Sequence, residues 1–236
     1  MLEEWDRRRA ALTQVRVADV ERPVLERADD HHLRQVLRAR VGEEVVVTDG
    51  RGAWRLCRVG SDGLDAVSER STDPRGTETT LYLSPLKGDR DEWALVKAVE
   101  LGVSRVVPLL SQRLAVRYRD EARRKSLARW RRLALEAAGQ CRRTYDLEVL
   151  EPVSVNDVPD DVAVCDFGGS GSWTGVRALA IGPEGGFSPD EWGPERRRVS
   201  LGQSVLRAET AAVVGCALMA LSLGDWGFTL EGSKNG

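Results

Sequence analysis

The stretch "IGPEGGFSPDEW", residues Ile181–Trp192, follows the small apolar run "ALA" and indicates how the second half of the chain folds. The apolar run and the three glycines predict a strand that ends in a tight loop. Ser188 then stands where a helix N-cap is expected, with Pro189 in the first turn and Glu191 placed for a capping box. Ligands bind at the carboxyl ends of strands in parallel α/β sheets, so this loop is a candidate binding site. Taken alone, "GPEGG" also fits a plain surface turn.

The loop lacks the two common phosphate-binding signatures. Pro183 and Glu184 occupy the middle of the glycine pattern, which is therefore not G-x-G-x-x-G, and no G-K-[ST] follows. A carboxylate in the loop repels a pyrophosphate, which weakens an interpretation as an NAD or ATP site. A ligand without phosphate stays compatible with the backbone groups of the loop. S-adenosylmethionine, with its adenosine and its sulfonium cation, is such a ligand.

Strands and helices alternate in this half of the chain. Short apolar runs predict strands at residues 79–86, 104–110, 161–166, 177–182 and 197–202. Helical periodicity predicts helices at residues 89–102, 120–140 and 208–224. The alternation predicts an α/β domain with a parallel sheet.

The three predicted helices carry different apolar patterns. In the first, Trp93, Val96, Lys97 and Glu100 stand at helical spacing. The second has an apolar stripe of Leu127, Trp130, Ala134, Ala137 and Ala138. The third is mostly apolar, so we expect it to be buried on most sides.

The first part of the chain reads as β-rich. In "EVVVTDGRGAWRLCRV", two β-branched runs flank Asp49-Gly50, which predicts a hairpin. A short amphipathic helix is expected before it, with Leu33, Val36 and Leu37 on one face and Gly42 as its stop. The segment "STDPRGTETT" reads as a linker. We therefore expect a first domain over residues 1–72 and a second over 73–236.

Composition places the chain among soluble globular proteins. The hydrophobic fraction is 42% and the charged fraction 31%, and no run approaches the ~20 apolar residues that span a bilayer. The first residues are charged and show no export signal, so we expect a cytoplasmic protein without a membrane partner. Four scattered cysteines without a C-x-x-C pair argue against a zinc site and a disulfide framework.

Hydrolase chemistry is not supported by the sequence. The two histidines, His31 and His32, both lie in the β-rich part, which argues against a Ser-His-Asp triad in the α/β part. The segment "GGSGSW", with Ser170 and Ser172, has no histidine nearby and reads as a flexible loop.

The stretch from Arg113 to Arg143 is strongly basic. It contains eleven Lys/Arg and three acids, a local balance of 11 − 3 = +8, although the whole chain has a net charge of −2. Such a stretch fits a polyanionic partner on one face, and a solvated helix face is the alternative.

Four segments, in this order and spacing, carry a family resemblance: "KGDRDEWALVKAVELGV", "RWRRLALEAAGQCRR", "IGPEGGFSPDE" and "LGQSVLRAETAAV". Together they resemble the RsmE family of 16S ribosomal RNA uridine N3-methyltransferases, in the SPOUT superfamily. The front segment "HHLRQVLRARVGEEVVVTDGRG" is similar to the PUA-like β-barrel of that family. The chain departs from the family pattern at "TYDLEV" and at "CDFGGSGSW", loops that are expected to line the substrate side of the site.

The resemblance implies a fold and a set of partners. It implies a C-terminal α/β domain with a parallel sheet and a trefoil knot, after a small PUA-like RNA-binding barrel. The implied cofactor is S-adenosylmethionine without a metal, and the implied partners are 16S ribosomal RNA or the 30S subunit and a second copy in a homodimer. Two other possibilities stay open: a SPOUT methyltransferase acting on transfer RNA or on a ribose 2′-hydroxyl, and a non-catalytic RNA-binding assembly protein.

The resemblance also implies roles for individual residues. The expected cofactor-binding residues are Ile181, Gly182, Pro183, Glu184, Gly185, Gly186, Leu201, Gly202, Ser204, Val205 and Leu206. The expected catalytic residues are Glu184 and Glu209, as candidate bases for the N3 proton, and Arg207, which would stabilise charge on the uracil oxygens. The expected RNA-binding residues are Lys87, Arg90, Arg113, Arg142 and Arg143.

Overall fold

A computed structural model describes residues 2–114 and 120–225, and the chain divides into two compact units. The first unit comprises Met1–Arg75 and Leu135–Asp146, and the second comprises Gly76–Ala134 and Leu147–Gly236. The segment 135–146 thus belongs to the first unit, although the division expected from the sequence assigns it to the second part.

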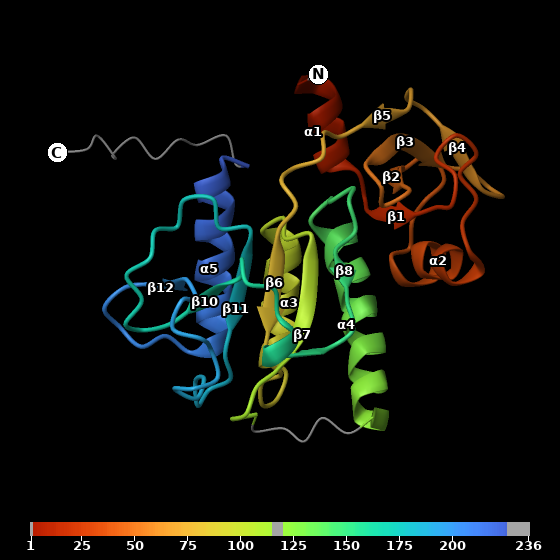
Figure 1. Ribbon diagram of the computed structural model, residues 1–236. Coiled ribbons are helices and arrows are strands. Elements are labelled where there is room, and N and C mark those ends of the chain that lie inside the picture. Colours follow the sequence, from red (N-terminus) through yellow and green to blue (C-terminus); the bar gives the residue numbers. More distant parts are fainter. Residues whose placement is uncertain (1, 115–119, 226–236) are drawn as a thin grey trace. The chain divides into compact units, whose positions relative to one another are not determined.

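The first unit is built on a five-stranded sheet (Figure 1). Its strands are β1 (Gln14–Arg16), β2 (Glu44–Thr48), β3 (Ala53–Val59), β4 (Leu64–Ala66) and β5 (Ser71–Thr72), and its helices include α1 (Leu2–Ala10) and α2 (Arg27–His31). The order is β1-β2-β3-β4, with β5 paired to β3, and only β1 and β2 run parallel. The predicted hairpin is confirmed: the Asp49 carboxylate accepts the N–H groups of Arg51 and Ala53, and Gly50 has φ +67°. The apolar core of the first unit includes Val45, Val47 and Leu33.

The predicted amphipathic helix is wrong in its details. The helix α2 continues into a π-helical turn, η1 (His32–Val36), in which the Leu37 N–H donates to the His32 carbonyl. Because a π turn closes over five residues rather than four, positions three and four apart no longer share a face. Leu33 is therefore fully buried, whereas Val36 is 60% exposed.

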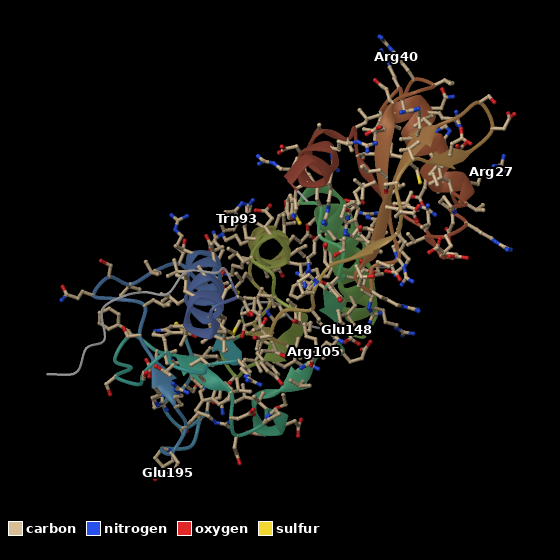
Figure 2. The ribbon with its side chains drawn as sticks, turned by 90° about the horizontal axis from the view of Figure 1, so that it is seen from above. Arg27, Arg40, Trp93, Arg105, Glu148 and Glu195 are labelled. Carbon is tan, nitrogen blue, oxygen red and sulfur yellow. The ribbon has the colours of Figure 1, made fainter. Side chains whose placement is uncertain are left out.

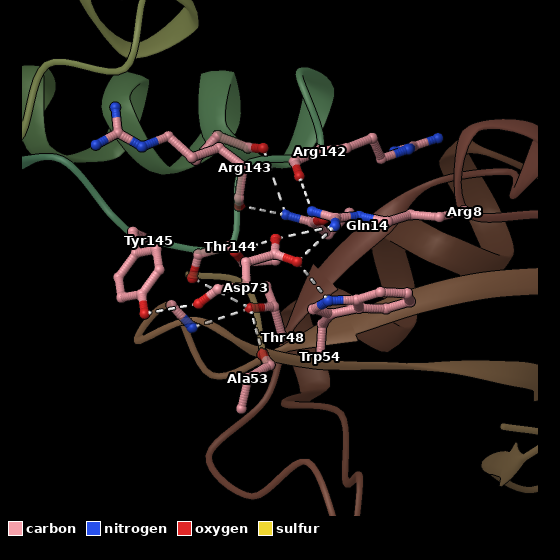
Figure 3. Close-up of polar contacts among 12 residues, drawn as sticks. Arg8, Gln14, Thr48, Ala53, Trp54, Asp73, Arg142, Arg143, Thr144 and Tyr145 are labelled. Atoms are coloured by element: carbon pink, nitrogen blue, oxygen red, sulfur yellow. Dashed lines mark hydrogen bonds and ion pairs between the residues drawn. The ribbon is translucent and has the colours of Figure 1, made fainter. Parts of the chain in front are cut away.

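A polar network joins the segment after helix α4 (Asp120–Gln140) to the sheet of the same unit (Figure 3). The Asp73 carboxylate accepts from Arg8 Nη1 at 2.9 Å, Trp54 Nε1 at 2.8 Å and Thr144 Oγ1 at 2.7 Å. The guanidinium of Arg8 also donates to the Arg142 carbonyl, and it lies over the Trp54 ring. This network explains why residues 135–146 belong to the first unit.

The second unit contains a seven-stranded parallel sheet, which confirms the predicted α/β class. Its strands are β6 (Thr80–Leu83), β7 (Arg105–Leu110), β8 (Glu148–Val149), β9 (Val153–Ser154), β10 (Ala163–Cys165), β11 (Ala178–Ile181) and β12 (Arg198–Val199). The order is β12-β10-β11-β6-β7-β8, with β9 paired to β7 and a 3-10 turn, η2 (Val155–Asp157), after it. The central strands are buried apolar runs, as expected for a sheet covered on both faces.

The helices bear out the predicted apolar patterns in part. The stripe of α4, from Leu127 to Ala138, is buried as predicted. In α3 (Arg90–Glu100) the buried residues are Asp91, Ala94, Leu95, Ala98 and Val99. Of the residues singled out from the sequence, Trp93 is 48% exposed (Figure 2), Glu100 is exposed, and Val96 and Lys97 are half-buried.

The last helix, α5 (Ala208–Leu223), packs against α3 and against β11 (Figure 1). A Cβ atom on Gly215 would lie 2.4 Å from Leu179 Cδ2, so the glycine permits a close approach of helix and strand. One face of α5 is buried, and its other apolar side chains are half-buried. Within residues 2–114 and 120–225, no helix has the length and apolar character that a membrane span requires.

Candidate functional site

A pocket of about 900 Å³ opens in the second unit, where the strands β10, β11 and β12 end. These three strands are neighbours in the sheet and run parallel, so the loops that follow them meet at one edge. All the residues predicted to bind the cofactor line this pocket: Ile181, Gly182, Pro183, Glu184, Gly185, Gly186, Leu201, Gly202, Ser204, Val205 and Leu206. Arg207 and Arg90 also line it.

Glycines give the pocket walls a backbone surface. Gly186 and Gly202 have φ values of +65° and +121°, a conformation that L side chains rarely adopt. No atom lies within 4 Å of a Cβ built on either glycine, so their exposed faces leave room for a ligand. At Gly182 a Cβ would lie 3.2 Å from the ring of Phe187, which stacks edge-on against Trp192.

The helix predicted after Ser188 is not formed, and residues 188–192 make turns instead. Pro194 follows Gly193 closely, and a proline disfavours helical backbone at the residue before it. Glu191 keeps part of the predicted capping role, because its Oε2 accepts from the Ser188 N–H at 2.9 Å. Its Oε1 accepts from the distant Gln112 N–H at 2.5 Å.

Glu184 connects its loop to the start of helix α3. Its Oε1 accepts from the Lys87 backbone N–H at 3.1 Å and lies 3.4 Å from Arg90 Nη1. Burial tends to raise the pKa of the Glu184 carboxyl, but the Lys87 N–H and the charge of Arg90 outweigh it, so the pKa is lowered. The carboxylate is thus ionised at neutral pH and held in place.

Arg207 and Glu209 lie at the start of α5. Arg207 is the N-cap residue, its side chain is exposed at the pocket, and it forms no ion pair with a described residue. Glu209 does not line the pocket itself. Its Oε1 lies 4.0 Å from Arg90 Nε, and its buried Oε2 has no hydrogen-bond partner among the residues described. Arg90 therefore stands between the two carboxylates predicted as bases.

The residues predicted to bind RNA fall into two groups. Lys87, Arg90 and Arg113 are exposed in the second unit, and Arg113 Nη1 donates to the Gly185 carbonyl at 3.1 Å. Arg142 and Arg143 belong to the first unit, apart from the pocket. The Arg142 guanidinium donates inward, to the carbonyls of Ala11 at 2.6 Å and Gly139 at 3.1 Å. The Arg143 side chain is half-buried, and burial lowers the pKa of its guanidinium.

Acidic side chains from outside the basic stretch between Arg113 and Arg143 neutralise some of its arginines in the folded protein. Arg129 pairs with Glu92, and Arg131 pairs with Glu151 at 3.0 Å. Arg117 and Arg119 lie outside the described residues. Such ion pairs reduce the positive charge that the stretch can offer to a polyanion.

A third loop of the pocket was not predicted as part of the site. It follows β10 and contributes Cys165, Asp166 and Phe167, with the Asp166 carboxylate 2.7 Å from Arg198 Nη1. A signal was present, since "DVAVCDFGGSGS" is also a buried strand followed by glycines. Burial raises the pKa of the Cys165 thiol to about 11, so this cysteine is not a thiolate nucleophile at neutral pH.

Two family models match the chain. Residues 73–220 match an RNA methyltransferase domain, and residues 25–67 match the PUA domain of RNA methyltransferases. The first match contains all three loops of the pocket. The second lies within the first unit and identifies its sheet as a PUA-type domain.

Proteins called "Ribosomal RNA small subunit methyltransferase E" are similar over most of the chain. The protein from Synechocystis sp. is 30% identical over 214 residues, which cover 79% of this chain and 69% of the relative. The protein from Mycobacterium tuberculosis is 28% identical over 231 residues, which cover 86% of this chain and 87% of the relative. A crystal structure of the Neisseria gonorrhoeae protein of that name, bound to S-adenosyl methionine, has 25% identity and a TM-score of 0.76. It covers 88% of this chain and 96% of its own.

Proposed function

We propose that this chain, which belongs to the ribosomal RNA small subunit methyltransferase E family, methylates 16S ribosomal RNA with S-adenosylmethionine as methyl donor. The observation that carries the proposal is the pocket in which the "IGPEGG" and "LGQSVLRAET" segments meet. The proposal also names the target atom: from the family resemblance, the methyl group is transferred to N3 of a uridine. The reaction takes place in the cytoplasm, on 16S RNA or on the 30S subunit.

The residues of the pocket fit this cofactor. Ile181, Leu201 and Leu206 offer apolar surface for an adenine ring, and the open faces of Gly186 and Gly202 leave backbone groups for its polar edges. The lining carries both signs of charge, with Glu184 and Asp166 beside Arg90, Arg198 and Arg207. That mixture suits a ligand with a sulfonium, an ammonium and a carboxylate better than a polyphosphate. When bound, the cofactor supplies a methyl group on a sulfonium, which is an electrophile.

The protein must then place uridine N3 and help to remove its proton. Of the two candidate bases, we assign this role to Glu209, which does not line the pocket itself but adjoins it through Arg90. The Oε2 of Glu209 has no hydrogen-bond partner among the described residues, whereas the carboxylate of Glu184 is held by Lys87 and Arg90 and its pKa is lowered. Glu184 accordingly shapes the loop. The exposed guanidinium of Arg207 is available to stabilise negative charge on the uracil oxygens.

RNA is held by exposed cations near the pocket and by the PUA-type domain. Lys87 and Arg113 supply phosphate contacts in the second unit, with binding that weakens as salt rises. The first part of the chain, residues 1–72, adds recognition of RNA shape. We also propose that the C-terminal α/β domain contains the trefoil knot that the family resemblance implies.

The enzyme acts as a homodimer. Apolar positions of α5 remain half-buried in the single chain: Val213, Val214, Ala217, Leu218 and Leu221. Trp93, on the helix that packs against α5, is 48% exposed. A second copy that covers these side chains removes apolar surface from water. Light scattering during size exclusion tests this: a dimer is expected for the wild type and a shift toward monomer for Leu218→Glu.

The decisive experiment is methylation of ribosomal RNA that lacks the modification, followed by mass spectrometry of its nucleosides. We expect N3-methyluridine in 16S RNA, as free RNA or in assembled 30S subunits. A ribose-methylated nucleoside or a product in transfer RNA would show that the chain acts on another target. No product on either form of the small-subunit RNA, together with retained RNA binding, would favour a non-catalytic role.

A further inference from the structure

Phe167 is an exposed aromatic side chain at the mouth of the pocket. It lies two residues after the end of β10, lines the pocket, and is 60% exposed. The fully or nearly buried apolar side chains of the lining, such as Ile181 and Ala208, lie deeper. A planar ligand that covers this exposed ring, beside the pocket, would gain the free energy of burying its apolar surface.

The backbone that carries Phe167 is fixed by the neighbouring strand end. The Asp166 N–H donates to the Val199 carbonyl at 3.0 Å, and the Ser200 hydroxyl donates to the Phe167 carbonyl at 3.3 Å. The Asp166 carboxylate pairs with Arg198 at 2.7 Å. The ring is therefore presented at a defined place, and binding does not have to order its backbone.

The loop around the ring is also closely packed. The Gly171 N–H donates to the Arg198 carbonyl at 2.8 Å. A Cβ on Gly169 would lie 2.6 Å from the Val199 backbone, so only glycine allows this approach. On the other loop of the mouth, Val205 is 83% exposed and adds a second uncovered apolar side chain.

We propose that Phe167 stacks on a base of the RNA substrate at the mouth of the pocket. The inference rests on the proposed function and adds a residue that positions the substrate. A nucleobase is the planar, aromatic surface that an exposed phenyl ring accepts. The pairing edge of uridine, which contains N3, must be unpaired for the reaction, so its faces are open to stacking. Stacking fixes the plane of the base and leaves N3 free to face the methyl donor.

The cofactor also contains a base, so the experiment must separate the two. The probe is 16S RNA transcribed with 4-thiouridine and irradiated with the full-length protein, followed by mass spectrometry of the crosslinked peptide. We expect a crosslink at Phe167 that the Phe167→Leu variant loses. This readout needs no turnover. An inactive wild type would count against the proposed function, while the crosslink would still decide the role of Phe167.

Variants then assign the effect to one ligand. Because the ring is exposed, Phe167→Leu should fold with an unchanged melting temperature. We expect Phe167→Leu to raise KM or Kd for the RNA by roughly 5- to 100-fold, as the loss of one stacked base would. Calorimetry should show S-adenosylmethionine binding within about twofold of the wild type. Phe167→Trp should restore RNA binding, because it restores a stacking surface.

Three results would overturn the proposal. The first is weaker cofactor binding in Phe167→Leu with unchanged RNA binding, which would place the ring over the cofactor. The second is unchanged binding of both ligands. The third is a crosslink map in which the peptide of Phe167 is absent from the wild type.

Discussion

Arg90 and Glu184 connect helix α3 to the "IGPEGG" loop, with Arg90 Nη1 3.4 Å from Glu184 Oε1. The same guanidinium lies 4.0 Å from Glu209, so one cation serves two carboxylates at the pocket. Arg90, expected from the sequence to contact RNA phosphate, is thus part of the pocket wall.

Replacing Arg90 should impair the site more than the fold. We expect Arg90→Gln to lower kcat/KM by about 10- to 100-fold, because both carboxylates lose their counter-charge. The ion pair is partly exposed, so the free energy of unfolding should change by less than about 1 kcal/mol. Transfer of a labelled methyl group and thermal unfolding measure the two effects. Arg129→Gln, which breaks an exposed pair with Glu92 outside the pocket, is the control. Equal activity of both variants would contradict this role of Arg90.

Much of this site could be predicted from local patterns. The glycine-rich segments after β11 and β12 were both identified, and the parallel order β12-β10-β11 brings them together. The loop after β10 has the same pattern, but it reads as a flexible loop from the sequence because no histidine lies near its serines. Nothing local indicates that it packs on the backbone of Val199.

Other features depend on contacts between distant segments and could not be predicted. Glu191 accepts from Gln112, 79 residues away, in addition to the expected bond from the Ser188 N–H. The side chain of Arg142 donates to Ala11, 131 residues away, which removes it from the expected basic surface. In η1, a local change of helical pitch moves Val36 out of the core.

Gly202 should be required for cofactor binding. Alanine at φ +121° is strained, which should cost about 1–2 kcal/mol of stability, and its methyl group would enter the open space of the pocket. We expect Gly202→Ala to weaken S-adenosylmethionine binding by about 10-fold or more, as measured by calorimetry. Gly193→Ala is the control, because Gly193 also has open space around its Cβ position but no positive φ and no place in the pocket. Similar cofactor affinities for the two variants would show that the cofactor does not bind against the backbone of Gly202.

Gly215 should be intolerant of a methyl group. The added Cβ would lie 2.4 Å from Cδ2 of the fully buried Leu179. We expect overpacking of about 1–3 kcal/mol to exceed the ~1 kcal/mol that alanine gains over glycine in a helix. Urea unfolding of Gly215→Ala, of Leu179→Val and of the double variant measures the coupling. The double variant should recover part of the loss, and a Gly215→Ala protein more stable than the wild type would contradict the tight contact.

Arg8 should stabilise the first unit through Asp73. Its side chain is 3% exposed, and its loss would leave the Asp73 carboxylate without its counter-ion. We expect Arg8→Met to cost about 2 kcal/mol, because Arg8 is buried but Asp73 is 30% exposed and keeps its hydrogen bonds from Trp54 and Thr144. Hydrogen exchange should show lost protection in β2 and β3. Arg7→Met is the matched control, since Arg7 is 39% exposed and its pair with Glu44 should contribute less than about 1 kcal/mol. Equal losses in both variants would refute the special role of Arg8.

Asp91 should make stability depend on pH. Burial raises its pKa to about 6, against the hydrogen bonds that its carboxylate accepts from Glu92 and Leu86. The native state therefore binds the proton more tightly than the unfolded chain, so stability from this group falls as pH rises from about 4 to about 6. The full cost above pH 6 is up to about 3 kcal/mol. Asp91→Asn should remove this dependence, so its stability relative to the wild type should rise between pH 4 and 6 and then level off in urea unfolding. A difference between Asp91→Asn and the wild type that is constant across this range would show that the Asp91 carboxyl does not titrate there.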